Sequence, residues 1–343
     1  MKKIRIAQIG INEYSHGRDI FNTLKALPDE YEIVGYALVE DEKQKFAHIL
    51  SAFDGYKELT LDQILNDPTI EAVTIETEEI HLTKYARLAA EHGKHIHMEK
   101  PGGACLAEFE EMLQAVEKGG KSFHIGYMYR YNPAVIDLLA KIKRGDLGEI
   151  ISVEGNMDCR HTPKTRDWLK TFEGGMTFFL GCHLIDLALQ IQGEPQRIIP
   201  LNKRSQIDGA EGEDFGLVVL EYVHGCSILK TSALEYGGYM RRQLVVTGTK
   251  GTVQLKPIEG LTDEGYYTDV RSVGETNDWY ADGKTERVAP YKRYDSMMRA
   301  FAKMARGELQ NPYSYRYERM LYQTLLRCCG KEEISKENKN DRI

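Results

Sequence analysis

The sequence predicts an α/β plus α+β protein: a doubly wound parallel sheet at the N-terminus, then a domain with a large, open, mostly antiparallel sheet. In the first third, short β-rich runs alternate with helical patterns, which is typical of a parallel sheet with helices on both faces. After residue 126 the expected strands are longer and follow one another like hairpins, which indicates antiparallel pairing. A chain of 343 residues has room for two domains. We place them at 1–125 and 126–330, with a charged tail at 331–343.

The elements of the first domain follow from periodicity and from turn residues. Apolar, β-prone runs predict strands at 3–9, 32–39, 72–76, 95–98 and 122–125. Apolar residues that recur on one helical face predict helices at 17–27, 82–92 and 106–116. Gly93 and the pair Gly119–Gly120 end the last two of these helices, because glycine is the usual stop after a helix.

The second domain is expected to begin with a helix at 133–142 and to continue as a sheet. Alternating runs predict strands at 215–223 and 227–234, joined at His224–Gly225, and further strands at 244–247 and 252–255. Helices at 294–304 and 315–328 complete the domain. Both faces of the strand at 215–223 carry apolar residues, so one face needs a partner beyond the covering helices. We therefore expect a homodimer or homotetramer that forms through this sheet.

Composition and charge exclude several classes of protein. The net charge is -7 and no basic block is present, which makes nucleic acid a poor partner. No run reaches the roughly 18 apolar residues of a membrane span, and residues 1–10 do not resemble a secretion signal, so we expect a cytoplasmic protein. The six cysteines form no C-x-x-C pair, and His95 and His97 face opposite sides of a strand. We predict no metal site.

The loop after the first strand is a candidate for dinucleotide binding. A dinucleotide fingerprint reads G-x-G-x-x-G, because glycines let backbone N–H groups approach the pyrophosphate at a helix N-terminus. Gly10 takes the first position, whereas Asn12 and Ser15 stand at the second and third. Glu40, at the end of the second expected strand, has the right place for the ribose hydroxyls. The alternatives are an ordinary strand-to-helix turn for the loop and a helix cap for Glu40.

Four segments, in this order, carry a more specific signal. Residues 93–101 read GKHIHMEKP, 75–81 read IETEEIH, 130–133 read RYNP and 174–186 read GGMTFFLGCHLID. They resemble the EKP strand end, the TPxxxH segment, the RFNP segment and the glycine-rich Asp/His helix of the Gfo/Idh/MocA oxidoreductase family. The resemblance runs from residue 4 to about residue 329. It implies an N-terminal Rossmann domain, NAD or NADP as cofactor, and hydride transfer at a hydroxyl or carbonyl carbon of a sugar, polyol or related small molecule.

The resemblance also assigns roles to individual residues. Lys100 and His183 would be catalytic. The cofactor would contact Gly10, Ile11, Asn12, Glu40, Thr77, Glu78, His81, Glu99 and Lys100. The substrate would contact Lys100, Arg130, Arg160, Trp168, Asp186 and His183. The 156–168 segment, which holds Arg160 and Trp168, has the hydroxyl-binding and aromatic side chains that a sugar needs, although a polar surface loop would look the same.

The chemistry of the reaction explains two of these roles. Oxidation of an alcohol requires a group that takes the hydroxyl proton, and Lys100 at the end of a parallel strand is well placed for this. His183 and Asp186 share a helix face, so we expect Asp186 to hydrogen-bond the imidazole. Four residues before His183 the family usually carries Asp, and this chain has Phe179. A protein that has kept the fold and binds a dinucleotide or sugar without turnover is the alternative.

We expect NAD rather than NADP as the cofactor. Glu40 and Asp41 would repel a 2′-phosphate, and no arginine directly follows the second strand. If NADP were preferred, Lys43 or Lys45 would be the phosphate partners.

Overall fold

The computed structural model describes residues 2–331, and it confirms the expected fold class: a parallel sheet at the N-terminus and a large, mostly antiparallel sheet after it. The predicted tail lies outside these residues except for Lys331. The first sheet has the strand order β2-β1-β3-β4-β5, and all its pairs are parallel. Its strands are β1 (Ile4–Ile9), β2 (Tyr31–Ala37), β3 (Ala72–Ile75), β4 (His95–Met98) and β5 (Phe123–Ile125).

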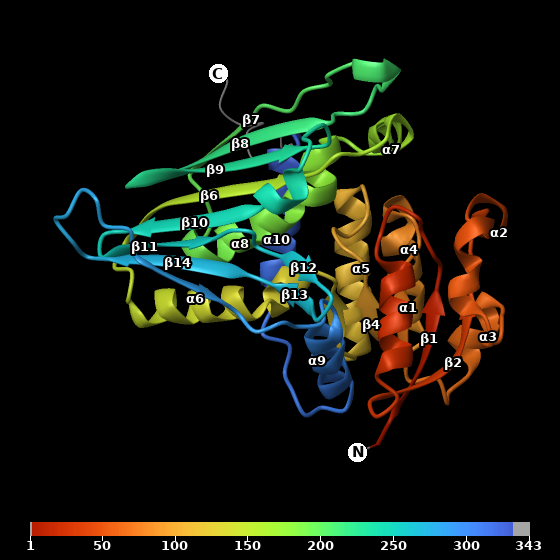
Figure 1. Ribbon diagram of the computed structural model, residues 1–343. Helices are drawn as coiled ribbons and strands as arrows, with labels where there is room; N and C mark the ends of the chain where they lie inside the picture. Colours follow the sequence, from red (N-terminus) through yellow and green to blue (C-terminus); the bar gives the residue numbers. More distant parts are fainter. Residues whose placement is uncertain (1, 332–343) are drawn as a thin grey trace, which may run out of the picture.

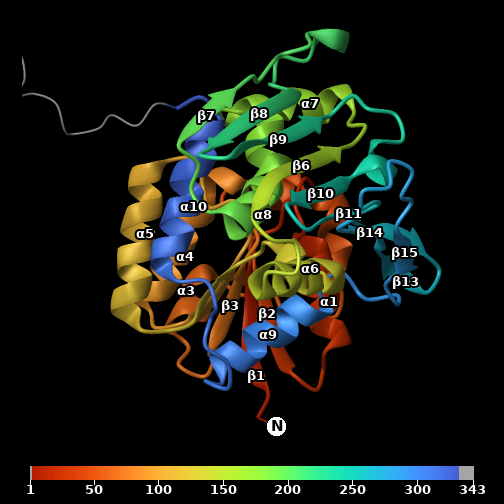
Figure 2. The ribbon, with the colours of Figure 1, turned by 90° about the vertical axis from the view of Figure 1, so that its left-hand side faces the viewer.

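Helices cover both faces of this sheet (Figure 2). They are α1 (Gly17–Ala26), α2 (Glu42–Lys45), α3 (Leu61–Asn66), α4 (Leu82–Glu91) and α5 (Leu106–Gly119). Helix α1 buries Ile20, Phe21 and Leu24, which recur on one face and pack on the sheet. Helix α5 ends where Gly120 takes a φ of 62° and its N–H bonds to the carbonyl of Val116, a stop that favours glycine.

The second sheet has the order β15-β14-β11-β10-β6-β9-β8-β7, with one parallel pair, β6 and β9. Its strands are β6 (Ile150–Asp158), β7 (Arg197–Pro200), β8 (Phe215–Tyr222), β9 (Gly225–Ser232), β10 (Gln243–Gly248), β11 (Gly251–Leu255), β14 (Asp269–Gly274) and β15 (Lys284–Arg287). A separate hairpin pairs β12 (Gly260–Thr262) with β13 (Gly265–Tyr267).

Helices lie against one face of the second sheet (Figure 1). They are α6 (Pro133–Arg144), α8 (Cys182–Gln192) and α10 (Tyr315–Cys328), while α7 (Pro163–Trp168) lies near one end. On β8 the covered face carries Val218 and Leu220, both buried. The opposite face carries Leu217 and Val219, which are partly exposed, and Ile228 on the neighbouring strand β9 is 45% exposed.

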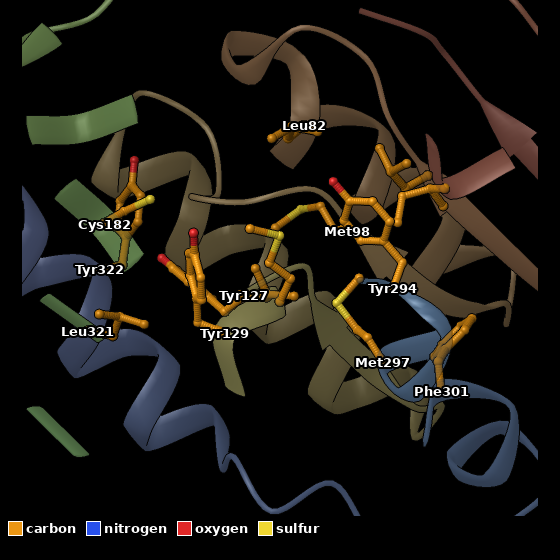
Figure 3. Packing of buried hydrophobic residues seen from close by; sticks show 14 of the residues in the cluster. Leu82, Met98, Tyr127, Tyr129, Cys182, Tyr294, Met297, Phe301, Leu321 and Tyr322 are labelled. Carbon is orange, nitrogen blue, oxygen red and sulfur yellow. The ribbon is translucent and has the colours of Figure 1, made fainter. Parts of the chain in front are cut away.

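Helix α9 (Asp295–Ala305) packs on the first sheet, although the sequence analysis placed it with the second domain. The ring of Phe301 lies 5.8 Å from that of His97 and 5.9 Å from that of His124, on β4 and β5. Figure 3 shows Met297 and Phe301 projecting from α9 into the cluster of buried side chains that includes Met98. The last part of the chain therefore helps to fix the two sheets relative to each other.

Two local expectations were wrong. Residues 177–181 form a π-helix (Thr177–Gly181) before α8, where the apolar pattern around His183 predicts one continuous α-helix. This stretch is apolar on all sides, so its periodicity gives no sign of a wider turn. The β8–β9 hairpin turns at Val223–His224, because Tyr222 pairs with Gly225. Gly225 serves another purpose: a Cβ there would lie 2.0 Å from the carbonyl oxygen of Ile151 on β6.

Candidate functional site

The carboxyl ends of four strands meet at one edge of the first sheet. Ile9 pairs with Ala37 and with Ile75, and Ile75 pairs with Met98. The residues that follow these strand ends therefore lie at one edge, which is where parallel sheets of this type bind ligands.

The loop after β1 is held close to β3. Gly10 has a φ of 84°, and a Cβ at this position would lie 2.7 Å from backbone atoms of Thr77. Asn12 is buried; its Nδ2 donates to Glu79 Oε2 at 2.9 Å, and its Oδ1 accepts from the N–H of Tyr14 at 3.1 Å. The predicted dinucleotide loop thus lies directly on the strand edge, with the N-terminus of α1 after it.

Buried carboxyl groups surround this loop, and several of their oxygens have no partner. Burial raises the pKa of Glu42 and of Glu79 to about 7, and it raises the pKa of Glu76 well above its usual range. Unpartnered buried oxygens among the described residues include those of Ser15, Glu42, Glu76, Thr77 and Glu79. Hydroxyl and amide groups of a dinucleotide would satisfy such oxygens, and protonated carboxyl groups do not repel a pyrophosphate. The residues present therefore fit the cofactor.

Glu40 lies at the outer end of this edge. Its carboxylate accepts from Lys84 Nζ at 2.6 Å and from Tyr85 Oη at 2.7 Å, and its φ is 50°. His81 Nδ1 lies 4.0 Å from the same carboxylate. The two lysines that could serve a 2′-phosphate are both paired, Lys43 with Glu58 at 2.9 Å and Lys45 with Glu78 at 2.7 Å.

Lys100 follows β4 and is fully buried. Its Nζ donates to the carbonyl oxygen of Phe179 at 2.8 Å and lies 4.2 Å from the centre of the Phe179 ring. Glu99 Oε1 is 3.8 Å from the same Nζ and 3.1 Å from His16 Nδ1. The nearby positive charges of His16 and Lys100 contribute to a lowered pKa of Glu99, against the effect of its burial. Lys100 thus stands between the strand edge and the π-helix of the second domain.

A cavity of about 180 Å³ opens beside the π-helix, between the two sheets. His183 lines it and is buried, and neither of its ring nitrogens has a hydrogen-bond partner among residues 2–331. The imidazole meets the rings of Tyr127 and Tyr129 edge-on, at 5.8 and 5.1 Å. Burial lowers the pKa of His183 well below its usual value, with a contribution from the positive charge of Lys100. This histidine is neutral near pH 7.

The expected hydrogen bond between Asp186 and His183 is wrong. Asp186 instead accepts from Arg130 at 2.8 Å, from Gln190 at 2.9 Å and from Tyr317 Oη at 2.8 Å. Arg130 also pairs with Glu318 at 2.6 Å, and all three charged groups are buried. Because α8 is covered on every side, residues three positions apart on it contact different neighbours. This network contains neither Lys100 nor His183.

The other two predicted substrate residues take separate places. Arg160 is exposed, with its guanidinium 4.6 Å from the ring centre of Tyr236, and it does not line the cavity. Trp168, on α7, stacks on Tyr14 of the predicted dinucleotide loop with ring centres 4.2 Å apart. A salt bridge of 2.8 Å between Lys164 and Glu13 joins the same two segments.

Most residues that line the cavity were not predicted as site residues from the sequence, among them Tyr239, Arg242 and Arg293. These three lie just before β10 and just before α9, in segments without a periodic pattern or a motif. Only the fold brings them to the site.

Residues 2–331 contain no group of three or more His, Cys, Asp and Glu side chains placed to bind a metal. In the same part of the chain, no helix is both long and apolar enough for a membrane crossing.

Comparison with protein families covers both parts of the chain. Residues 4–127 match the sequence model of an oxidoreductase family with an NAD-binding Rossmann fold, and residues 136–254 match the GFO/IDH/MocA C-terminal domain. An uncharacterized oxidoreductase of Escherichia coli is 28% identical over 63% of this chain, and scyllo-inositol 2-dehydrogenase (NADP(+)) of Bacillus subtilis is 27% identical over 69%. The alignments span 60% and 64% of these two relatives, less than two thirds of their length.

Solved structures share the fold over nearly the whole chain. Levoglucosan dehydrogenase, in complex with NADH and levoglucosan, superposes with a TM-score of 0.76 at 19% identity, over 96% of this chain and 98% of that one. The aldose-aldose oxidoreductase of Caulobacter crescentus, complexed with glycerol, gives a TM-score of 0.77 at 18% identity, with the same coverage of both chains. With both halves matched in sequence and in fold, the chain belongs to the Gfo/Idh/MocA family of oxidoreductases and carries that family's NAD-binding Rossmann fold.

Proposed function

We propose that this protein is an NAD-dependent oxidoreductase that transfers hydride between nicotinamide and a hydroxyl-bearing carbon of a sugar or polyol. The observation that carries the proposal is the position of Lys100, buried between the cofactor edge of the first sheet and the cavity of the second domain. The printed names of two similar proteins, a scyllo-inositol dehydrogenase and a levoglucosan dehydrogenase, support a polyhydroxy substrate.

The cofactor would lie along the strand edge. The backbone at Gly10, Ile11 and Asn12 would face its pyrophosphate, and Glu40 would accept from its ribose hydroxyls. The predicted contacts after β3 and β4 follow the same edge: Thr77, Glu78, His81 and Glu99. When bound, nicotinamide supplies or accepts the hydride.

The protein's own part in the reaction is proton transfer. As the neutral amine, Lys100 would take the hydroxyl proton during oxidation and become the ammonium, and as the ammonium it would return the proton during reduction. Neutral His183 would hydrogen-bond the substrate from the cavity wall. The carbonyl of Phe179 holds the Lys100 ammonium in place, and Glu99 balances its charge. Because Lys100 is shielded from water, its contact with the substrate would not compete with solvent.

Cofactor preference follows from the charges at the outer end of the edge. The Glu40 carboxylate and its neighbour Asp41 disfavour a 2′-phosphate, and Lys43 and Lys45 already have carboxylate partners. We therefore propose NAD as the preferred cofactor.

Two measurements test the function. Calorimetric titration with NAD(H) and NADP(H) should detect binding, with tighter binding of the NAD forms. Absorbance at the reduced-nicotinamide band should then show turnover with members of a sugar and polyol panel. Dinucleotide binding without turnover on any of them would instead support a catalytically silent protein, and absence of binding would contradict both functions.

The proposal extends to assembly and location. Partly exposed Leu217 and Val219 and exposed Ile228 form an apolar outer face on β8 and β9, which supports a homodimer or homotetramer through this sheet. All six cysteines are free thiols in the structure, which supports a reducing compartment such as the cytoplasm.

A further inference from the structure

The cavity beside Lys100 has a cationic wall. Its charged lining residues are Arg242 and Arg293, which come from outside the segments that the family motifs mark. Three histidines also line it, and no carboxylate does. A cavity built for a neutral sugar alone would have no evident need for two guanidinium groups.

One carboxylate, Glu259, lies behind the two arginines. It accepts from Arg293 Nε at 2.8 Å and from Arg293 Nη2, and its distance to Arg242 Nη1 is 3.4 Å. Two guanidinium groups thus share one buried carboxylate, which leaves one positive charge in the wall. Asp158 does not remove it, since this carboxylate pairs with Lys230 at 3.0 Å.

Several polar groups of the cavity have no protein partner. Nε of Arg242 donates to the backbone carbonyl of Asp158, and its Nη1 donates to Tyr129 Oη and to Glu259 Oε1. Its Nη2 donates to no nitrogen or oxygen atom of residues 2–331. Both ring nitrogens of His183 and Nε2 of His161 lack partners too, within the same residues. Buried polar groups without a partner, such as these imidazole nitrogens, are rare unless a ligand, an ion or water satisfies them.

The charges around the two imidazoles of the cavity are positive. Burial lowers the pKa of His161 to about 4, with a contribution from Arg242. The pKa of His183 is lowered by burial and then by Lys100, His16, Arg293 and Arg242, all of them groups that can carry positive charge. A positive potential at both imidazoles favours a negatively charged ligand between them.

Resting on the oxidoreductase function proposed above, we propose that the substrate is a sugar acid whose carboxylate binds at Arg242 and whose hydroxyl groups reach His183 and Lys100. The carboxylate would accept from the free Nη2 of Arg242 and would neutralise the remaining positive charge of the wall. A sugar phosphate fits less well, because its charge of about -2 would exceed that single positive charge.

The test compares matched ligands on the wild-type protein with NAD⁺ bound. D-glucuronate, D-glucose and glucose 6-phosphate differ only at one end of the molecule, so their dissociation constants from calorimetry isolate the carboxylate. We expect D-glucuronate to bind at least ~10-fold more tightly than the other two, as a charge-assisted hydrogen bond of about 1.5–3 kcal/mol implies. Turnover of the same three ligands is followed separately.

Two arginine variants test whether the preference for D-glucuronate depends on Arg242. Arg242→Gln leaves the Arg293–Glu259 pair intact and removes the unbalanced charge, so the preference for D-glucuronate over D-glucose should disappear. Arg241→Gln is the matched control, since Arg241 is exposed and pairs with Glu235 at 2.9 Å. Circular dichroism checks that both variants fold; should Arg242→Gln fail to fold, Arg242→Lys serves, which keeps the charge and therefore the preference.

The outcomes separate this inference from the function on which it rests. Equal affinity for D-glucuronate and D-glucose, or tighter binding of glucose 6-phosphate, overturns the sugar-acid assignment even when hydride transfer is observed. Carboxylate-selective binding that is lost in Arg242→Gln supports it, even if none of the three ligands is turned over. In that case the proposed function alone is in question.

Discussion

The ammonium of Lys100 donates to the backbone carbonyl of Phe179 at 2.8 Å, across the boundary between the two sheets. By the motif resemblance of residues 174–186, Phe179 stands at the place of an Asp, and its side chain can neither accept nor donate a proton. The backbone therefore supplies the hydrogen-bond acceptor at this position. The carbonyl belongs to a π-helical turn, a geometry that is frequent at functional sites because it changes which backbone groups are free to bond elsewhere.

Replacement of Lys100 tests its role in proton transfer. We expect Lys100→Met to lower kcat by at least ~100-fold, the usual lower range for an acid–base group, with a much smaller change in NAD⁺ affinity. Steady-state kinetics and calorimetry measure the two quantities. Lys94→Met is the control, because Lys94 is also buried and donates to backbone carbonyls, of Asp67 and Ile70, but at the opposite end of β4. If Lys100→Met turns over at the wild-type rate, the lysine has only a structural role.

Variants of Phe179 distinguish the contribution of its backbone carbonyl to kcat from that of its aromatic ring. Phe179→Leu keeps the carbonyl, so kcat should stay within about ten-fold of wild type, a difference below about 1.4 kcal/mol in activation free energy. Phe179→Asp should lower kcat further and reduce the melting temperature, because it buries a carboxylate among the aromatic rings of Trp168 and Phe172. Higher activity in Phe179→Asp would show that the missing carboxylate limits the present site.

Substitutions of His183 and of Asp186 should have different effects, one on catalysis and the other on stability, although both residues lie on α8. His183→Ala is expected to lower kcat/KM, by less than Lys100→Met does, with little effect on unfolding. Asp186→Asn should instead destabilise the fold by about 3–5 kcal/mol, the usual cost of breaking a buried ion pair, because Arg130 loses a partner. Urea unfolding and steady-state kinetics on both variants measure the two effects. A purely kinetic defect in Asp186→Asn would instead support the predicted role of the aspartate as a substrate contact.

The buried carboxyl groups should make cofactor binding depend on pH. Glu42 and Glu79 have a pKa of about 7 in the folded protein, so both ionise as the pH rises from 6 to 8. The added negative charge opposes the pyrophosphate, and NAD⁺ affinity should fall over this range. Glu79→Gln should weaken the trend, whereas Glu58→Gln, at an exposed site, should leave it unchanged. A flat affinity profile in the wild-type protein would contradict the prediction.

The carboxyl groups of Glu42 and Glu79 also make the stability of the fold depend on pH. Their pKa is higher in the folded chain than in the unfolded chain, where it is near 4.5. The folded state therefore binds more protons between these values, and the resulting stabilisation is complete below pH 4.5 and is lost as the pH rises through about 7.

Assembly can be tested at the outer face of the second sheet. Ile228→Lys places a charge in the middle of that face, and we expect it to convert an oligomer into a monomer at micromolar concentration. Light scattering after size-exclusion chromatography gives the mass. Val223→Lys, in the β8–β9 turn, is a control of similar chemistry away from the strand face. A monomeric wild-type protein would exclude the proposed assembly.

The sequence was sufficient for the fold class and for the position of Lys100 at the strand edge. Lys100 could be placed because it directly follows a short strand, and parallel strands bring such positions to one edge. His183 could be placed by motif, but its neighbours could not: spacing on α8 suggested Asp186, whereas Tyr127 and Tyr129 are the contacts observed. Periodicity describes one face of a helix, and a helix that is buried all round has no such face.

The positions of Arg242 and Arg293 in the cavity could not be predicted from the sequence, for a different reason. Both lie in irregular segments, and both pair with Glu259, which belongs to a third segment. No local rule links three loops that meet only in the folded second domain. The charge of the cavity is thus a property of the tertiary fold.

The stacked rings of Tyr14 and Trp168 have a kinetic consequence. One ring belongs to the loop predicted to bind the dinucleotide, and the other to α7, the short helix beside the cavity that we propose for the substrate. Tyr14 also lines that cavity, so a dinucleotide that shifts the loop alters the cavity entrance before the second ligand arrives. We therefore expect an ordered mechanism in which the dinucleotide binds first and leaves last, with product inhibition patterns that Trp168→Ala would turn toward random order.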